Sequence, residues 1–393
     1  MDSYDKNGRR DSVILLPPPG DYQVTADKPI RKANGRTHRI SIARLAKCAA
    51  ASFSLLIYIA VFASGMINLI DRGIDSVFIG EVFPEASSVA LFGKRNALPE
   101  SKPGDPLSPA DDPGSTDTHT LKIKKVDHSA SSVHDIYNET QYSPNEDAIL
   151  ADEHAYPSAE YTAAMYGVGA PLVLVIHTHG TEAFTKEGTT ECPVNEAFRS
   201  SDTNENVVAV GDAFCETLER CGIGTIHCPE MFDLPTIMEA YDNSAAAVRA
   251  YLAEYPSIAY VFDIHRDALL SESGEYLAPT FAYGGKSTAE VMLVVGTDAA
   301  GAFHPDWDEN LALALGMQSV MIERYGGMAR GYNLRTASFN QQLSPGFLLA
   351  EVGSCANTLA EAKRAAALLA LTFYETVEKS SPPISPSEAI AGY

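Results

Sequence analysis

Two histidines and a glutamate follow an apolar run of five residues in this chain. Residues 172–176 are apolar and mostly β-branched, and His177, His179, Gly180 and Glu182 come directly after them. Alternate strand residues point the same way and a glycine lets the backbone turn, so imidazole and carboxylate donors can meet here in a small volume. The pattern predicts metal binding. The alternative is that one histidine ends a strand and the other is solvated.

A second apolar run also ends in a histidine. His265 is flanked by Asp263 and Asp267. A carboxylate beside a metal-bound imidazole can hydrogen bond to it and fix its orientation. Taken alone, a histidine at the end of a strand is more often a structural residue with satisfied hydrogen bonds.

Glu351 lies inside a third apolar run. Burying an unpaired carboxylate is costly and raises its pKa, so its position needs a reason. The sequence predicts either an ion pair with an arginine such as Arg266 or Arg335, or the proton-accepting base of a hydrolytic site. If His179, His265 and Glu351 stand at three strand ends of one sheet, they can together bind one zinc ion and activate a water.

These residues need a scaffold to position them, and the rest of the chain alternates strands with helices. Apolar residues recur at helical spacing in four segments, and the last of these opens with a capping box at Thr358 and Glu361. The predicted helices span 207–221, 244–254, 306–325 and 358–377. The predicted strands span 120–126, 223–227, 258–264, 291–295 and 347–352, with a hairpin at 281–286. This order predicts an α/β fold, a three-layer domain with a mostly parallel central sheet.

The N-terminal part of the chain predicts a membrane anchor and a tether. Residues 49–70 are apolar and uncharged, long enough to cross a bilayer, and residues 28–47 contain seven basic and no acidic residues. An uncleaved anchor fits better than a signal peptide, because the run is long and has no clear cleavage site. The predicted order is a cytoplasmic tail (1–48), one transmembrane helix (49–70), a disordered extracytoplasmic linker rich in Ser, Pro, Asp and Asn (71–168), a catalytic domain (169–379) and a C-terminal tail (380–393).

Charge and cysteine content exclude some functions. The formal net charge of −22 argues against a nucleic-acid partner, which needs a basic face. Cys48 lies at the predicted inner membrane edge, and the other five cysteines cannot all pair, so no disulfide framework is expected. A cysteine hydrolase that uses Cys355 with His304 is a rival hypothesis. Cys355 follows a strand, however, and does not begin a helix, where the helix dipole would lower its pKa.

Several longer motifs carry a resemblance to a known family. They occur, in order, at residues 175–182, 206–211, 255–258, 263–268, 294–298, 304–311, 339–346 and 351–353. Over residues 171–377 the chain resembles the stage II sporulation protein P family of endospore-forming bacteria. The resemblance implies a zinc-dependent N-acetylmuramoyl-L-alanine amidase, with a fold similar to the zinc amidases and the phosphorylase/hydrolase-like domains.

The resemblance also implies roles for individual residues. His179 and His265 match the zinc histidines, and Glu351 matches the catalytic glutamate. The third zinc ligand is Glu182 or Glu205, and the constancy of the His-Thr-His-x-x-Glu motif in the family favours Glu182. Arg266, beside the second histidine, is a candidate for binding a stem-peptide carboxylate or an oxyanion. The alternative for Arg266 is a structural ion pair with Asp263 or Asp267.

The function implied by the resemblance is peptidoglycan hydrolysis during septal thinning and engulfment in sporulation. The enzyme would cut the amide between N-acetylmuramic acid and L-alanine, with peptide cross-links as a further substrate. It would act outside the cytoplasm at the sporulation septum, held by its single-span anchor, with a lytic transglycosylase as partner. The alternative is a catalytically inactive, membrane-tethered scaffold that binds the septal cell wall.

Overall fold

The computed structural model describes residues 120–193, 196 and 198–393. The predicted cytoplasmic tail, the transmembrane segment at 49–70 and the linker up to 119 lie outside the described residues. Within the described ranges, none of the helices combines the length and the apolar character needed to cross a bilayer.

The centre of the fold is a seven-stranded sheet with strand order β2-β10-β9-β11-β6-β3-β5. Five of its six neighbouring pairs are parallel, and only β9 and β11 run antiparallel. The strands are β2 (Ile136–Asn138), β3 (Val173–Ile176), β5 (Thr225–His227), β6 (Tyr260–Asp267), β9 (Val291–Gly296), β10 (Tyr332–Arg335) and β11 (Gly346–Ser354).

The antiparallel pair divides a sheet that the sequence predicts as mostly parallel. A single residue, Glu290, separates strand β9 from the hairpin strand β8 (Lys286–Ala289), whereas the parallel neighbours are reached through helices. A short connection cannot return the chain to the same edge of a sheet, as a helical crossover does, so β9 enters from the opposite side. Strands β2, β9 and β10 therefore run opposite to β3, β5, β6 and β11.

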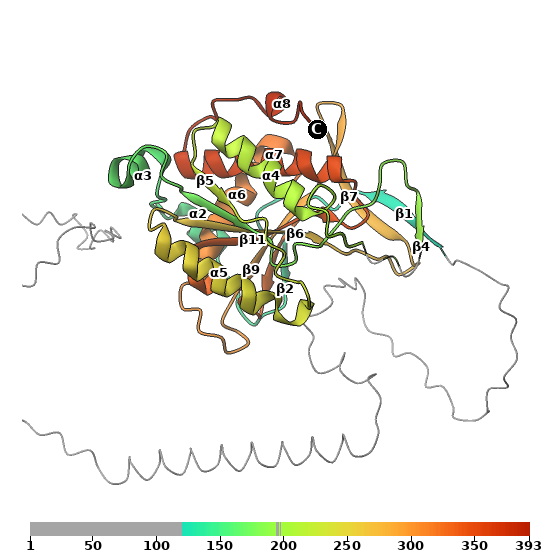
Figure 1. Ribbon diagram of the computed structural model, residues 1–393, viewed down its shortest axis with the longest axis horizontal. Helices are drawn as coiled ribbons and strands as arrows, with labels where there is room; N and C mark the ends of the chain where they lie inside the picture. Colours follow the sequence, from blue (N-terminus) through green and yellow to red (C-terminus); the bar gives the residue numbers. More distant parts are fainter. Residues whose placement is uncertain (1–119, 194–195, 197) are drawn as a thin grey trace, which may run out of the picture. The chain divides into compact units, whose positions relative to one another are not determined.

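Helices cover both faces of this sheet, which confirms the three layers (Figure 1). One face packs under α4 (Val207–Arg220), α6 (Trp307–Tyr325) and α7 (Leu359–Glu378), with apolar residues of all three helices in the larger core. The other face packs under α5 (Ala240–Glu254), where Val248 meets Leu174, Val261 and Phe347. Helix α7 begins with the predicted capping box, in which the side chains and backbone of Thr358 and Glu361 bond reciprocally.

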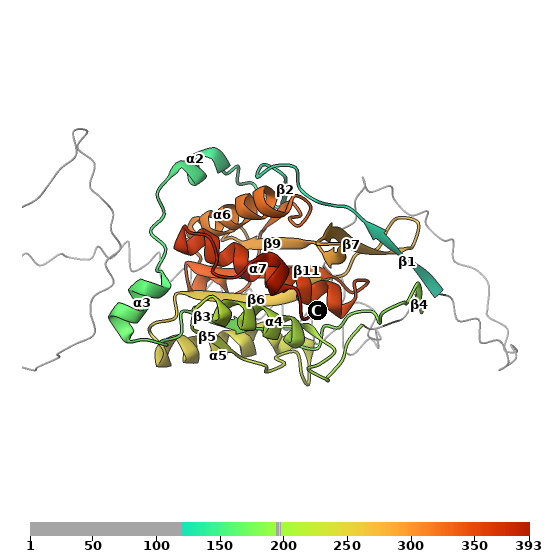
Figure 2. The same cartoon turned by 90° about the horizontal axis from the view of Figure 1, so that it is seen from above.

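A smaller four-stranded sheet lies at one end of the central sheet, as both ribbon views show (Figures 1 and 2). Its order is β4-β1-β7-β8, and it includes the predicted strand at 120–126 and the predicted hairpin, whose turn is Gly284–Gly285. The alternating exposure of β1 explains why its pattern was visible in the sequence. Its remaining strands are β1 (Thr120–Val126), β4 (Glu191–Pro193) and β7 (Tyr276–Tyr283).

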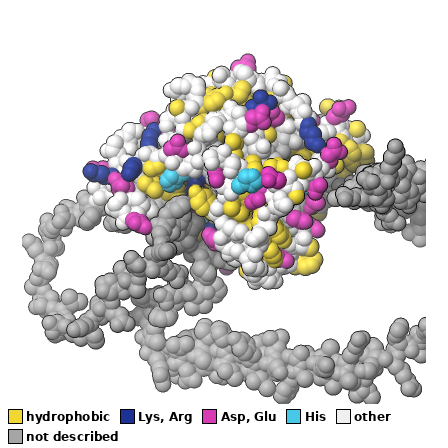
Figure 3. Space-filling view, turned by 180° about the vertical axis from the view of Figure 1, so that it is seen from behind, with side chains coloured by type: hydrophobic (Ala, Val, Ile, Leu, Met, Phe, Trp, Pro, Cys, Tyr) yellow, Lys and Arg dark blue, Asp and Glu magenta, His cyan; other side chains and the backbone are white. Residues whose placement is uncertain are grey.

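The prediction of a disordered linker is wrong for residues 120–168, because β1 and β2 there pair with strands of the two sheets and two short helices follow them. One more short helix lies in the predicted C-terminal tail. Strand β2 pairs with β10 at the edge of the central sheet, and residues just after it pack against α6 through a stack of Tyr142 on Trp307. Figure 3 shows Asp and Glu side chains spread over the face opposite to that of Figure 1, as the net charge leads one to expect. The remaining elements are α2 (Glu146–Ala151), α3 (Ala159–Tyr166), α8 (Pro386–Ala389) and the 3-10 turns η3 (Ile237–Glu239) and η4 (Gln341–Leu343).

Candidate active site

Three adjacent parallel strands, β3, β6 and β11, bring the predicted site residues together. Glu351 on β11 is the register partner of His265 on β6, so the two side chains share one face of the sheet. Ile176, the last residue of β3, pairs with Asp263, which places the loop carrying His179 and Glu182 beside the same end of β6. The face they share is the one covered by α5.

His265 lies between two carboxylates. Its Nε2 is 2.9 Å from Asp263 Oδ1, and its Nδ1 is 3.5 Å from Glu182 Oε2. Burial acts to lower the pKa of His265, but the Asp263 and Glu182 carboxylates outweigh it and raise that pKa well above its usual value. Asp263 is itself fixed by Thr178, whose backbone N–H and hydroxyl donate to it at 2.8 and 2.5 Å. The orientation of the His265 ring is therefore set from both sides.

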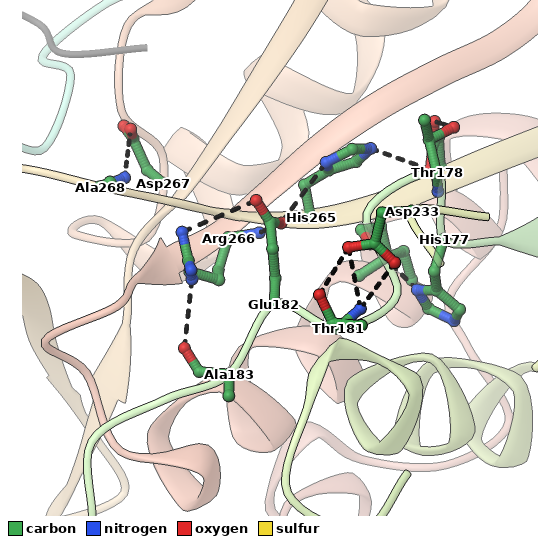
Figure 4. A network of polar contacts seen from close by, with 12 residues as sticks. His177, Thr178, Thr181, Glu182, Ala183, Asp233, His265, Arg266, Asp267 and Ala268 are labelled. Carbon is green, nitrogen blue, oxygen red and sulfur yellow. Dashed lines mark hydrogen bonds and ion pairs between the residues drawn. The ribbon is translucent and has the colours of Figure 1, made fainter. Parts of the chain in front are cut away.

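Glu182 is buried and faces both His265 and Arg266 (Figure 4). Its Oε1 lies 3.6 Å from Arg266 Nη1, and its Oε2 accepts the Arg266 backbone N–H at 3.2 Å. Burial opposes ionisation, but the Arg266 guanidinium and the His265 imidazole outweigh it and hold the pKa of Glu182 below its usual value. Glu182 is therefore an ionised carboxylate inside the protein.

The other side-chain donors of Arg266 bind backbone carbonyls. Its Nε donates to the carbonyl of Ala183 at 3.1 Å and its Nη2 to that of Phe198 at 2.9 Å, and the residue is only 7% exposed. The ion pair expected with Asp263 or Asp267 is wrong, because the carboxylate partner is Glu182. In this arrangement Arg266 ties the loop after β3 to β6 and holds Glu182 in place.

His179 is half-buried and faces the His265 ring edge-on. The ring centroids are 5.3 Å apart at an interplanar angle of 90°, and the ring of Tyr241 stands against the other side at 5.5 Å and 87°. The buried Nδ1 of His179 has no hydrogen-bond partner among the described residues. Burial and the neighbouring His265 lower the pKa of His179. A neutral imidazole with a free nitrogen is the form that binds metals.

Glu351 is not held by an arginine. Its Oε2 is buried without a hydrogen-bond partner among the described residues, while Arg335 pairs with Glu139 at 3.0 Å. Burial, and after it the Asp267 carboxylate, raises the pKa of Glu351 to about 8. Asp267 is neutralised in turn by the buried Arg330, whose Nη1 lies 2.9 Å away. Glu351 therefore binds a proton near neutral pH, as a general base and acid must.

The side chains predicted as metal ligands are close together but do not form a ready-made metal site. No group of three or more His, Cys, Asp or Glu side chains within the described ranges is placed to hold a metal ion as it stands. Of the two candidates for a third ligand, Glu182 contacts His265, whereas Glu205 is exposed and accepts a hydrogen bond from Ser200 at 3.2 Å.

Two features of the site have no sequence signal. Tyr241, in the first turn of α5, forms a wall beside His179, and its position relative to the three strands follows only from the packing of α5. Thr178 is linked to the same helix through the Ser244 hydroxyl at 2.9 Å. Tyr241 belongs to none of the motifs above, and the His-Thr-His motif that contains Thr178 does not predict its contacts with Asp263 and Ser244.

The geometry does not favour a cysteine nucleophile. Cys355 is 1% exposed, and burial raises the pKa of its thiol to about 11. His304 Nε2 interacts with Asn310 Oδ1 at 3.0 Å. All five cysteines among the described residues are buried and free.

The fold and the buried cluster define an α/β protein with a histidine–carboxylate site towards the carboxyl ends of parallel strands. The chain belongs to the Stage II sporulation protein P (SpoIIP) family, whose pattern matches residues 109–374. It is 30% identical over 215 residues to Stage II sporulation protein P of Bacillus subtilis (strain 168), a match that covers 52% of this chain and 50% of the relative. The chain thus spans about half the length of that relative.

Solved structures with similarity to this chain include three amidases. The N-acetylmuramoyl-L-alanine amidase AmiC2 of Nostoc punctiforme is 13% identical with a TM-score of 0.31, covering 58% of this chain and 98% of the amidase. The Ami1 amidase of Mycobacterium smegmatis is 10% identical with a TM-score of 0.31, and the match covers 54% of this chain and 99% of the amidase. An amidase of Clostridium difficile 630 is 14% identical with a TM-score of 0.29, and the match covers 53% of this chain and 94% of that amidase. The family assignment rests on the sequence matches.

Proposed function

We propose that this protein is a zinc-dependent peptidoglycan hydrolase that cleaves the amide between N-acetylmuramic acid and the L-alanine of the stem peptide. One observation carries the proposal: His179, Glu182, His265 and Glu351 converge from β3, β6 and β11 on one face of the sheet. A zinc-dependent hydrolytic site needs a set of metal ligands and a proton-transferring carboxyl close together, and this cluster offers both.

The donor set fits zinc in kind. Two imidazoles and a carboxylate are the ligands of many catalytic zinc sites, which keep one position for water. The unpartnered Nδ1 of His179 supports this use, because a buried polar atom without a partner needs a reason. His179, His265 and Glu182 would hold the ion, and Asp263 would orient the His265 ring. A bound zinc would supply Lewis acidity and lower the pKa of a water.

Glu351 then acts as the proton carrier. Its raised pKa lets it take a proton from the attacking water and give it to the leaving amine near neutral pH. The buried setting that raises this pKa also favours proton transfer to the amine over loss to solvent. Arg266 keeps Glu182 ionised and in place, and this is the role we assign to it in place of direct substrate binding.

The biological setting follows from family membership and the sequence. We propose that the enzyme thins the septal cell wall and acts in engulfment during sporulation, cutting the muramoyl amide and also peptide cross-links. A single-span anchor at 49–70 would hold the domain outside the cytoplasm, with a lytic transglycosylase opening the glycan strands. The acidic charge suits a soluble exported domain that does not bind nucleic acid.

The test is release of stem peptides from purified peptidoglycan by the full-length protein. Mass spectrometry of the products should find free peptides that begin with L-alanine. His179→Ala, His265→Ala and Glu351→Gln should each lower the rate by about 10²-fold or more, since general acid–base catalysis alone contributes about 10²–10⁴-fold. Zinc content should fall in the two histidine variants and stay unchanged in Glu351→Gln.

A matched pair of variants decides between the two third-ligand candidates. Glu182→Gln should remove activity and zinc, and the exposed Glu205→Gln should leave both unchanged. Full activity in all three variants of His179, His265 and Glu351 would exclude the mechanism. Binding of the wild-type protein to peptidoglycan without any product would favour the scaffold alternative.

A further inference from the structure

Tyr241 has a free hydroxyl beside the candidate site. It is the second residue of α5 and is partly exposed. Its ring stands edge-on to His179 at 5.5 Å. Burial, and after it the carboxylates of Asp263, Glu351 and Glu182, raises the pKa of its hydroxyl well above the usual value, so the phenol keeps its proton. No hydrogen bond joins this hydroxyl to another of the described residues. The phenol is therefore a hydrogen-bond donor available to a molecule bound at the site.

The backbone is strained at Phe339 and Asn340, two residues that contact Tyr241. Phe339 and Asn340 adopt consecutive left-handed conformations, with φ of 49° and 61°. Residues other than glycine rarely adopt this conformation, and it costs of order 1–3 kcal/mol per residue unless its surroundings maintain it. In this conformation the Phe339 ring lies against that of Tyr241, at a centroid distance of 5.8 Å. Such strain is typical of functional sites.

Asn340 anchors the first turn of α5. Its Nδ2 donates to the Tyr241 carbonyl at 2.8 Å and to the Ser244 hydroxyl at 3.1 Å. The single hydroxyl proton of Thr178 is donated to Asp263, the carboxylate beside His265, at 2.5 Å, and the same Thr178 oxygen lies 2.9 Å from the Ser244 hydroxyl. A series of polar contacts thus leads from the backbone of Tyr241 through Asn340, Ser244 and Thr178 to Asp263, whose Oδ1 lies 2.9 Å from His265 Nε2. These contacts fix where the ring of Tyr241 stands relative to His179 and His265.

From this geometry we infer that Tyr241 is a further catalytic residue, whose phenol O–H donates a hydrogen bond to the carbonyl oxygen of the scissile amide as negative charge develops on it. The inference rests on the proposed function. Glu351 and Glu182 cannot supply this donor when ionised, because a carboxylate only accepts. The donors of Arg266 are directed to Glu182 and to two backbone carbonyls. Tyr241 offers a donor hydrogen beside His179 that no other described residue accepts.

Tyr241 would act on the carbonyl oxygen, where negative charge develops during amide hydrolysis. The water oxygen bonds to the amide carbon while the C=O π pair moves onto the carbonyl oxygen, which accepts from Tyr241. That pair then re-forms the C=O bond as the C–N bond breaks, and the nitrogen takes the proton that Glu351 removed from the water. The products are a carboxylic acid on the lactyl group and a free amine on L-alanine. A preorganised donor at the carbonyl oxygen stabilises the charge at its maximum.

The direct test is Tyr241→Phe, which removes the hydroxyl and keeps the ring that packs on His179 and Phe339. Loss of one donor of this kind lowers kcat by about 10²–10³-fold, so we expect a fall of that size with KM, zinc content and Tm near wild type. The matched control is Tyr255→Phe, at the far end of α5 and about 20 Å away along the helix axis. It removes the same group and should leave kcat unchanged.

A second variant keeps the inference testable if Tyr241→Phe is poorly folded. Asn340→Gly keeps the left-handed backbone and removes the amide that anchors α5. It should lower kcat by about tenfold, and it should add little to Tyr241→Phe, because both changes act on one hydrogen bond to the substrate. A Tyr241→Phe enzyme as active as wild type, or fully additive effects, would overturn the inference and leave the proposed function intact. No peptide release by the wild type would overturn both.

Discussion

Glu290 offers a quantitative test of the buried charges behind the site. Its side chain is 0% exposed, and both carboxyl oxygens accept the backbone N–H of His128, at 3.0 and 3.1 Å. Burial raises the pKa of Glu290 from its ordinary 4.5 to about 7. Between these two values the folded protein keeps a proton that the unfolded chain has lost, so stability falls as pH rises through this window and levels off above pH 7.

The size of the effect follows from the two pKa values. At about 1.4 kcal/mol per pH unit, the difference between 4.5 and about 7 corresponds to about 3 kcal/mol. Glutamine resembles the protonated form of Glu290, so Glu290→Gln should remove this penalty. The variant should match wild type near pH 4.5 and exceed it by about 3 kcal/mol near pH 8. Urea unfolding of both proteins at several pH values measures the difference directly.

The control for this experiment is another buried glutamate. Glu361 is 2% exposed, but Lys125, Ser287, Asn357 and the capping box bond to it, and these contacts outweigh burial and lower its pKa. Both its folded and its unfolded forms are ionised above about pH 5.5, so the difference between Glu361→Gln and wild type should not change from there to pH 8. If the wild-type and Glu290→Gln curves also run parallel from pH 4.5 to 8, the reasoning about Glu290 is refuted.

Three further outcomes are expected. Thr358→Ala should destabilise the protein by about 1 kcal/mol in urea unfolding, because it removes the cap of α7. Gly211→Ala should cost about 1–3 kcal/mol, since its Cβ would lie 2.6 Å from the Nε2 of the fully buried His177, whereas Gly392→Ala meets nothing within 4 Å and should have no effect. A chelator should abolish peptide release, and added Zn²⁺ should restore it where Mg²⁺ does not.

Much of this fold is predictable from the sequence because the pattern of apolar residues is strong. Runs buried on both faces gave β3, β6, β9 and β11, and the caps and glycines marked the helices. Strand β10 was not predicted, because its residues Tyr-Asn-Leu-Arg alternate polar and apolar side chains over only four positions. It becomes a strand because β9 and β2 supply hydrogen-bond partners on both sides. That is tertiary context that a local pattern does not contain.

The sequence predicts the site residues that lie on or just after buried strands, but not the arrangement of the loop residues. The sequence indicated that His179, His265 and Glu351 follow or end buried strands, and the sheet places those strands next to one another. It did not decide between Glu182 and Glu205, since both lie in the same polar loop. The fold separates them, because Glu182 and Arg199 form a β-bridge that lays this part of the loop over β6. The orientation of a loop depends on such bridges, which leave no periodic signal.

Two candidate site residues differ from a buried structural amide in how fully their polar atoms are hydrogen-bonded. Gln341 is fully buried and bonds the backbone at Gly296 and Val294, so its amide completes the fold. His179 and Glu351, by contrast, make no side-chain hydrogen bond to the described residues, although each has a buried polar atom. Leaving such an atom unpaired costs about 1–3 kcal/mol. A fold that pairs the amide of Gln341 but leaves an atom of each of these two residues unpaired, on β11 and in the loop after β3, retains them for a bound molecule to complete.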